Sequence, residues 1–272
     1  MKKIVALVLA ISLTALALTS CAQKSKKVSS PDDFVGARIA VQSATTASDS
    51  VDEMVAAGKK ISIMRYEKVT ECFSDLKLGR VDAVYVDSVV AAYYTKDDDT
   101  YNRVWLSNEA EPMGICLRKD ATSLAAAVEA AIDTLYYNGK IAELATKHFG
   151  DDFTKGLREV KEAPVIPEFE GLKKAGTLTI GSEIGYPPME YTTDDGLTNQ
   201  GFDIDVANEI GKLLGGLKVE FVNTSFDGIF AGLEKGQYDC IISAISITES
   251  RQAKYILTKP YVANALCIVT KK

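Results

Sequence analysis

The sequence alternates short apolar runs with segments of helical pattern, and this alternation restricts its fold more than any other feature. Runs rich in strand-forming residues lie at 38–41, 61–64 and 82–87, and helical patterns lie between them at 48–57 and 69–78. Strands separated by helices indicate βαβ units and a mostly parallel sheet. We therefore predict an α/β fold.

The alternation stops once and then begins again. Residues 113–150 read as a strand and two helices, whereas residues 151–171 show no periodicity and contain Pro164 and Pro167. From residue 172 strand and helix patterns alternate again, up to a last strand at 265–270. This interruption predicts a linker, and hence two lobes with a small-ligand crevice between them.

The first 21 residues have the pattern of an export signal. Lys2 and Lys3 precede the almost wholly apolar residues 4–18, which as a helix would span about 22 Å, less than the roughly 30 Å of a bilayer core. Small residues stand directly before Cys21, as in lipoprotein signals. We expect lipid attachment at Cys21, with residues 22–30 as a tether; the alternative is an ordinary cleaved signal with an incidental cysteine.

Charge and the reactive residues exclude several kinds of site. The 272-residue chain has a formal net charge of −6, which argues against nucleic acid as a partner. His148 is the single histidine and is expected to be solvated at a helix end. The spacing of four further cysteines is wide, so we expect them to be free, buried thiols: Cys72, Cys116, Cys240 and Cys267. We expect no metal site and no cofactor.

Three stretches carry a resemblance to a known family. They are residues 180–191 (IGSEIGYPPMEY), 201–207 (GFDIDVA) and 239–251 (DCIISAISITESR). Together they resemble the polar amino-acid-binding proteins of ABC importers, in which they open the mature chain. Residues 36–46 (GARIAVQSATT) resemble an element that follows them in the family, but here that element comes first.

The resemblance implies a two-lobed periplasmic-binding-protein-like fold that is circularly permuted. Residues 31–107 would form lobe two, residues 113–150 plus 172–272 would form lobe one, and 151–171 would join the usual chain ends. One covalent crossover, near 108–113, would then remain. We expect a looser open form from such a chain.

The resemblance also assigns the two charged ends of a bound amino acid. Arg251 would form a bidentate pair with the ligand carboxylate, aided by backbone N–H groups near Ser246 and by Thr46 of lobe two. Asp87 would hold the ammonium with the Ala244 carbonyl and the Ser246 hydroxyl. Arg251 would otherwise be a solvated surface arginine, and Asp87 and Thr46 would otherwise be helix N-caps.

The remaining candidates surround the ligand side chain. Tyr186 and Phe226 resemble the aromatic residues that sandwich it, although both also fit ordinary core packing. Ser243 lies beside Ala244 in the third motif, and Glu183 stands where relatives that bind cationic amino acids carry an acid. Ala44 replaces a usual glycine, and its Cβ is expected to disturb the backbone there.

These residues imply an extracytoplasmic, lipid-anchored protein that captures a free amino acid and delivers it to an ABC transporter permease. The amino acid would be polar, with cationic ones among the candidates. Two alternatives stay open, namely an enzyme on the same scaffold, such as a dehydratase of cyclic acids with Glu183 as its acid, and a ligand-sensing module.

Overall fold

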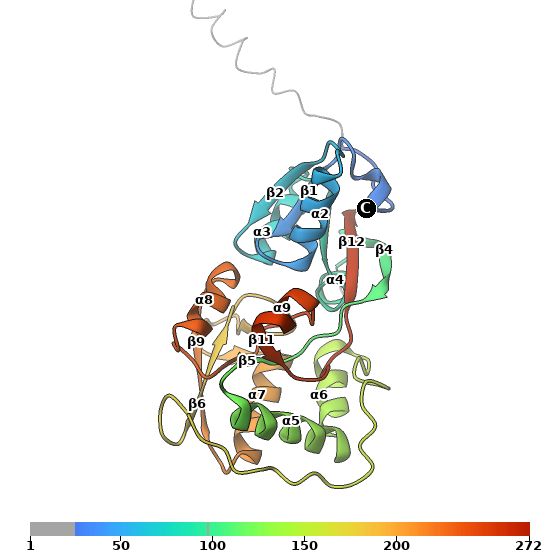
Figure 1. The fold of residues 1–272 in the computed structure, drawn as a ribbon. Coiled ribbons are helices and arrows are strands. Elements are labelled where there is room, and N and C mark those ends of the chain that lie inside the picture. The colour runs from blue at the N-terminus through green and yellow to red at the C-terminus, as the bar shows by residue number, and fades with distance from the viewer. Residues whose placement is uncertain (1–24, 97) are drawn as a thin grey trace, which may run out of the picture.

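The computed structural model of the chain describes residues 25–96 and 98–272. The expected signal peptide at 1–21 and the lipid site at Cys21 lie outside these residues. Two α/β lobes, each built on a five-stranded sheet, lie one above the other in Figure 1. The predicted α/β class and two-lobed architecture are confirmed.

Lobe two, the upper one in Figure 1, contains the sheet with strand order β2-β1-β3-β12-β4. Its strands are β1 (Arg38–Gln42), β2 (Ser62–Tyr66), β3 (Ala83–Asp87), β4 (Tyr101–Ala110) and β12 (Ala265–Lys271). Its helices are η1 (Pro31–Phe34), α2 (Thr46–Ala56), α3 (Val69–Lys77) and α4 (Ser88–Lys96). The apolar strands are buried, so the sheet forms the centre of this lobe.

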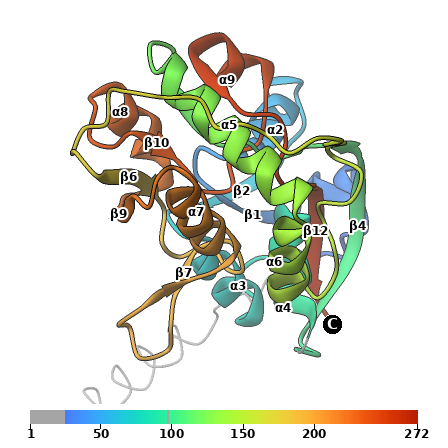
Figure 2. The same cartoon turned by 90° about the horizontal axis from the view of Figure 1, so that it is seen from below.

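Lobe one contains the sheet with strand order β11-β5-β10-β6-β9. Its strands are β5 (Cys116–Arg118), β6 (Thr177–Ser182), β9 (Lys218–Asn223), β10 (Cys240–Ile241) and β11 (Tyr255–Leu257), beside the hairpin of β7 (Tyr191–Thr192) and β8 (Asn199–Gln200). Its helices are α5 (Thr122–Tyr137), α6 (Lys140–Phe149), α7 (Phe202–Leu213), η2 (Phe226–Gly228), α8 (Ile229–Glu234) and α9 (Glu249–Lys254). Figure 2 shows α5, α6 and α7 near one another at the outer end of this lobe.

The last strand lies in the other lobe from the one expected. We placed all of 172–272 in lobe one, but β12 pairs with β3 and β4 of lobe two. Leu266, Cys267, Ile268 and Val269 are all buried, so this strand needs the interior of a sheet, and the place between β3 and β4 provides it.

Two covalent crossovers therefore join the lobes, at residues 111–115 and 258–264, and the expectation of a single crossover is wrong. The two segments are hydrogen-bonded side by side, with Met113 N–H donating to the Val262 carbonyl at 3.0 Å and Tyr261 N–H to the Met113 carbonyl at 2.9 Å. Two paired crossover segments restrict the motion of the lobes more than one segment would. An unusually loose open form is therefore no longer expected.

Each sheet is mixed rather than mostly parallel. The strands joined by helices pair in parallel, as β1 does with β2 and β3 and as β6 does with β9 and β10. The strands that flank the crossovers pair antiparallel instead, because they run from one lobe to the other. The strand β4 was not predicted, since its mostly exposed residues lack an apolar run.

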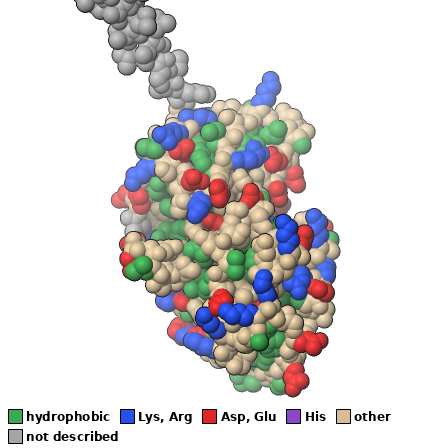
Figure 3. Space-filling model, turned by 90° about the vertical axis from the view of Figure 1, so that its left-hand side faces the viewer, with side chains coloured by type: hydrophobic (Ala, Val, Ile, Leu, Met, Phe, Trp, Pro, Cys, Tyr) green, Lys and Arg blue, Asp and Glu red, His purple; other side chains and the backbone are tan. Residues whose placement is uncertain are grey.

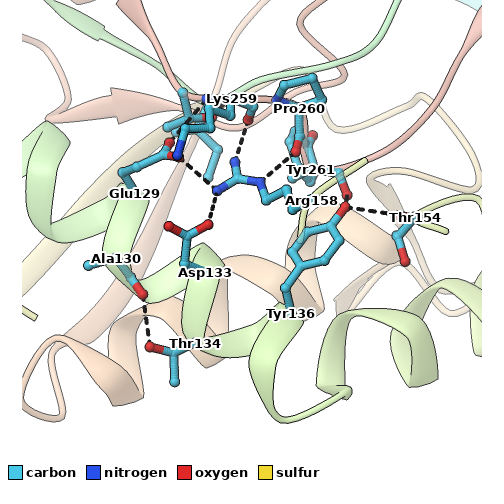
Figure 4. A network of polar contacts seen from close by, with 12 residues as sticks. Glu129, Ala130, Asp133, Thr134, Tyr136, Thr154, Arg158, Lys259, Pro260 and Tyr261 are labelled. Carbon is cyan, nitrogen blue, oxygen red and sulfur yellow. Dashed lines mark hydrogen bonds and ion pairs between the residues drawn. The ribbon is translucent and has the colours of Figure 1, made fainter. Parts of the chain in front are cut away.

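Residues 151–171 contain no helix or strand and run along α5 (Figure 2). The side chain of Arg158 holds this linker in place and is only 2% exposed. Its guanidinium contacts Glu129 at 2.8 Å and Asp133 at 2.7 Å, and its Nε donates to the Pro260 carbonyl at 2.7 Å (Figure 4). The linker is thereby fastened both to α5 and to the second crossover.

The expected tether at 22–30 is partly packed on the fold. Val28 is buried in the same apolar cluster as Phe34, Leu266 and Ile268, and Lys26 N–H donates to Asp82 Oδ1 at 3.1 Å. The first and last described segments of the chain therefore share one cluster in lobe two. This packing could not be predicted from the lysine- and serine-rich composition of the segment, because a single valine, Val28, supplies the apolar contact.

Other predictions about single residues had mixed outcomes. Cys72, Cys116, Cys240 and Cys267 are free and buried, as expected. The expectation of a solvated His148 is wrong: its side chain is 9% exposed and its Nε2 lies 2.7 Å from Asp205 Oδ2, because the end of α6 packs on α7. Among the described residues no group of three or more His, Cys, Asp or Glu side chains is arranged to hold a metal.

The surface seen in Figure 3 intersperses acidic and basic side chains and shows no single basic stripe. Within residues 25–96 and 98–272, none of the helices combines the length and apolarity that a bilayer crossing requires.

Candidate ligand site

A cavity between the lobes lies where several strands end. Gln42 and Asp87 are the last residues of β1 and β3 in lobe two, and Ser243 follows β10 of lobe one. The carboxyl ends of parallel strands are the usual ligand-binding edge of α/β sheets. The space between these strand ends measures about 300 Å³ with its solvent-open parts included, and it is lined by Gln42, Thr45, Thr46, Asp87, Tyr186, Glu190, Phe226, Ser243, Ala244, Ser246 and Arg251.

Every site residue nominated from the sequence lines this cavity except Glu183. Those eight are Thr46, Asp87, Tyr186, Phe226, Ser243, Ala244, Ser246 and Arg251. Glu183 is buried behind the lining and contacts Gln42, as described below. Gln42 and Glu190 were missed, although each is a polar residue at the edge of an apolar run, which is a detectable signal.

Arg251 is a largely buried cation without an ion-pair partner in the part of the chain that the structure describes. It lies in α9, which Thr248 caps by accepting from Arg251 N–H at 3.2 Å. Its Nη1 donates to the Ser246 carbonyl at 2.9 Å, and its guanidinium lies over the rings of Phe230 and Phe226, at 5.2 and 5.9 Å from their centroids. Among the described residues no carboxylate lies within 4.0 Å of it. Burial lowers its pKa, so an anion brought beside it would relieve a desolvated charge.

Asp87 is the facing acid in lobe two, and both of its oxygens accept hydrogen bonds. Tyr186 donates its hydroxyl to Oδ2 and Asn264 donates its amide to Oδ1, each at 2.5 Å. Burial raises the pKa of Asp87 to about 6. Within the described residues no backbone N–H of α4 donates to the Asp87 carboxylate, which accepts from Tyr186 and Asn264 instead. The N-cap alternative is therefore excluded for Asp87.

Thr45 and Thr46, which follow β1, have different hydrogen-bond partners. Thr45 caps α2, since its Oγ1 accepts from Ser48 N–H at 3.2 Å. Thr46 instead donates its hydroxyl to Glu111 in the first crossover at 2.7 Å. Thr46 is thus not the N-cap, and its side chain links lobe two to the hinge.

Two alanines beside the cavity have left-handed backbone conformations. Ala44 has a φ of 62° and Ala244 a φ of 48°. A left-handed conformation costs a residue with a Cβ about 1–2 kcal/mol. The Cβ of Ala44 was expected to shift φ, but the backbone keeps the conformation that a glycine would adopt. Such strain next to a cavity is typical of functional sites.

Glu183 and Gln42 join the lobes behind the cavity. Gln42 donates Nε2 to Glu183 Oε2 at 3.2 Å and to the Glu67 carbonyl at 2.9 Å. Glu183 is 2% exposed, and burial raises its pKa to about 7. The adjacent Lys68 acts in the opposite direction.

The buried side-chain atoms without a hydrogen-bond partner gather at this one place. Within the described part of the chain they are Gln42 Oε1, Ser182 Oγ, Glu183 Oε1 and Glu190 Oε2. Three of the four are amide or carboxyl oxygens, which accept hydrogen bonds when the carboxyl is ionised. Buried polar atoms are normally satisfied, so this cluster favours a ligand that donates several hydrogen bonds.

The arrangement suits a small zwitterion with an additional donor group. The unpaired guanidinium of Arg251 attracts an anion, Asp87 attracts a cation, and the unsatisfied acceptors lie beyond them. Tyr186 and Phe226 supply flat apolar surface between these polar ends.

Comparison with known proteins agrees with this chemistry. Residues 178–272 match the model of the bacterial extracellular solute-binding proteins, family 3. The L-cystine-binding protein TcyA of Bacillus subtilis is 33% identical over 142 residues, 52% of this chain and 51% of TcyA. The putative amino-acid ABC transporter-binding protein PatH of Vibrio harveyi is 36% identical over 118 residues, 43% of this chain and 46% of PatH.

The chain thus spans about half the length of these curated relatives. Among solved structures, the arginine-bound domain 1 of TmArgBP is 31% identical and is matched over 36% of this chain and 81% of that domain, with a TM-score of 0.31. The segment 178–272 is thus similar to the bacterial extracellular solute-binding proteins of family 3.

Proposed function

We propose that this protein captures a free polar amino acid between its two lobes and delivers it to an ABC transporter permease. The observation that carries the proposal is the largely buried guanidinium of Arg251, which has no ion-pair partner among the described residues, in a cavity that Asp87 also lines. In this arrangement Arg251 binds the ligand carboxylate and Asp87 binds its ammonium. The similarity to TcyA, which binds L-cystine, and to PatH, an amino-acid ABC transporter-binding protein, supports the same class of ligand.

The ligand is proposed to have a cationic side chain. The unsatisfied oxygens of Gln42 and Glu183 would each accept a hydrogen bond from an ammonium or guanidinium group. Burying these acceptors unpaired costs about 1–3 kcal/mol each, so a ligand that pairs them is favoured over one that does not. A solved relative is an ancestral arginine-binding protein bound to arginine, 43% identical over 29% of this chain and 34% of its own, with a TM-score of 0.28.

A thermal-shift screen of the free amino acids tests both parts. A ligand that binds only the folded state raises the unfolding midpoint. We expect the largest rise with arginine or lysine and a smaller one with neutral polar amino acids. The Glu183→Gln variant should lose the preference for the cationic ligands and keep the response to the neutral ones. No rise with any amino acid would refute the proposed function.

Binding rather than catalysis is proposed for this site. The enzyme alternative needs a free acid beside the substrate, and Glu183 was its candidate. In the proposed complex the two oxygens of Glu183 accept from Gln42 and from the ligand side chain, so Glu183 is not a free acid. Nothing in the site favours the sensing alternative.

We further propose that the chain is a circular permutation of the family's usual order. Support comes from the position of the family match, at the end of the chain, and from the apolar cluster that Val28 shares with Leu266 and Ile268. A cut in lobe two, rather than at a crossover, accounts for both covalent crossovers. A rearranged chain that joins Lys272 to Val28 through a short glycine-rich linker and begins within residues 160–165 should bind the same ligand. Loss of folding in that chain would refute the permutation.

The lipid anchor at Cys21 and the location outside the cytoplasm remain part of the proposal. A Cys21→Ala variant should move from the membrane fraction to the soluble fraction. Retention of the variant in the membrane fraction would contradict the anchor.

A further inference from the structure

Two carboxyl groups lie buried together in lobe one, one at the wall of the ligand cavity and one behind it. Glu190 follows the Tyr186 turn, and Asp203 lies in the first turn of α7. Both are 0% exposed, and no basic side chain is paired with either within the described residues. Neither was nominated from the sequence.

The oxygens of Asp203 are both occupied by donors. Tyr261 donates its hydroxyl to Oδ1 at 2.6 Å, and Ala244 N–H donates to Oδ2 at 2.9 Å. A carboxyl that accepts two such bonds is stabilised in its ionised form. Asp203 is therefore the charged member of the pair.

Glu190 has the opposite surroundings. Its Oε1 accepts the Ser243 hydroxyl at 2.6 Å, but its Oε2 is buried and no donor from the described residues reaches it. If Glu190 were ionised, a second negative charge would be buried beside Asp203, and Glu190 Oε2 would have no hydrogen-bond donor. Burying a charge in this way costs free energy. A proton on Oε2 removes the second charge and turns the unpaired oxygen into a donor.

We propose that Glu190 retains a proton at neutral pH and shares it with Asp203, and that the pair positions Ser243 and Ala244 for the ligand. Glu190 holds the Ser243 hydroxyl, which also accepts from Glu183 N–H at 3.0 Å. Asp203 holds the backbone N–H of Ala244, whose left-handed conformation needs such support. This role of the pair in binding depends on the proposed function.

Among the described residues, the titratable groups that face the pair bring no positive charge to compensate it. Asp203 and Glu183 disfavour ionisation of Glu190 by their charge, and Tyr186 and Tyr261 are the other titratable groups coupled to it. Burial and the charge of Asp203 raise the pKa of Glu190 well above its usual value. Two carboxyl groups that share one proton have this property in general.

Infrared spectroscopy of the ligand-free protein tests the shared proton directly. At about pH 8 the carboxyls of Asp87 and Glu183, with pKa values of about 6 and about 7, are mostly ionised. We expect the carbonyl stretch of a protonated carboxyl to persist at that pH in wild type and to be absent in Glu190→Gln. A spectrum without that band, or with the band unchanged in Glu190→Gln, would overturn the shared proton.

Calorimetric titration with the amino acid found by screening tests the positioning. Glu190→Gln keeps the shape, the acceptor for Ser243 and a donor for Asp203, so its affinity should stay close to wild type. Glu190→Leu leaves the Ser243 hydroxyl and one Asp203 contact unpaired, and its affinity should fall about tenfold or more. Thermal unfolding confirms that each variant is folded before it is titrated.

The pH profile separates a positioning role from a structural one. Wild-type affinity should fall at alkaline pH as Glu190 loses its proton, and the Glu190→Gln profile should lack that fall. Equal affinity of Glu190→Leu and wild type would overturn the positioning role, as would identical alkaline profiles of Glu190→Gln and wild type. Failure of wild type to bind any amino acid would instead refute the proposed function, while the infrared band would still decide the shared proton.

Discussion

The two halves of the cavity differ in how their polar groups are satisfied. In lobe one, Ser243 and Glu190 bond to each other, and Arg251 bonds to Ser246 of the same lobe. In lobe two the polar groups bond outward, as Asp87 does to Tyr186 and Gln42 to Glu183. Lobe one is thus assembled before closure, whereas the lobe-two half is completed by contacts across the cleft. We infer that lobe one receives the ligand first and that lobe two closes on it.

The largest effect should come from the lobe-one cation. Arg251→Ala should weaken ligand binding by about 2–5 kcal/mol, or on the order of 30-fold or more, because a buried carboxylate would lose its partner. Calorimetric titration measures the change, with thermal unfolding as the check of folding. Arg65→Ala, at a 40% exposed arginine of lobe two, is the matched control and should bind normally. Normal affinity in Arg251→Ala would break the assignment of lobe one as the receiving half.

A smaller loss is expected from the lobe-two acid. Asp87→Asn keeps the size of the side chain but removes the charge that pairs with the ligand ammonium, at a cost of about 1.5–3 kcal/mol. The association rate should change little and the dissociation rate should rise, since lobe two acts after the encounter. Stopped-flow fluorescence of Trp105 in lobe two separates the two rates. A loss confined to the association rate would reverse the proposed order.

Affinity should rise with pH between about pH 5 and pH 8. Burial raises the pKa of Asp87 from 3.8 to about 6 and that of Glu183 from 4.5 to about 7. A cationic group binds their ionised forms, so one pH unit below the pKa of Asp87 the protonation of Asp87 alone should lower affinity about tenfold, and protonation of Glu183 should lower it further. Titration in buffers of different ionisation enthalpy should show proton release on binding. Proton uptake would contradict the roles of both acids.

The stability of the ligand-free protein should change in the opposite direction. Both acids have folded-state pKa values above their unfolded values, so they hold more protons when folded. Their contribution to stability is present below about pH 4 and is lost as pH rises through about 6 to 7. Denaturant unfolding at a series of pH values measures it, and Asp87→Asn with Glu183→Gln should flatten the dependence.

A modest effect is expected from the contact across the cleft. Tyr186→Phe removes the hydroxyl bonded to Asp87, a hydrogen bond worth about 0.5–1.5 kcal/mol. The ligand-free protein should open, which X-ray scattering detects as a larger radius of gyration. Tyr137→Phe, at a 50% exposed tyrosine, is the control. An unchanged radius would show that the lobe-two half does not depend on this contact.

The smallest effect on binding should come from the linker. Arg158→Met removes the contacts to Glu129 and Asp133 and should lower the unfolding free energy by about 1–3 kcal/mol, since those carboxylates are 23% exposed. Ligand affinity should stay the same because Arg158 lies away from the cavity. Lys161→Met, exposed in the same linker, should alter neither property. A change in affinity would show that the linker controls the hinge.

Much of this arrangement can be predicted from the sequence because it depends on local pattern. The helices and most strands follow apolar periodicity, and Tyr186, Phe226 and Arg251 lie in motifs that the resemblance identifies. All three line one cavity. The ends of apolar strands also carry Asp87 and Ser243 to that cavity, as the α/β alternation implies.

The features that were missed depend on partners distant in sequence. The apolar run of β12 does not reveal which sheet has room for it, and only its pairing with β3 and β4 decides. Glu190 is buried because Ser243 and Asp203 lie beside it, and periodicity carries no information on either contact. His148 is buried for a similar reason, since Asp205 of α7 meets it.

The central claim is most directly tested by calorimetric titration of the wild-type protein with arginine, lysine and glutamine at about pH 8. We predict one binding site, tighter binding of a cationic amino acid than of glutamine, and loss of that binding in Arg251→Ala. Absence of measurable binding by all three, with no response to any other amino acid, would contradict the claim.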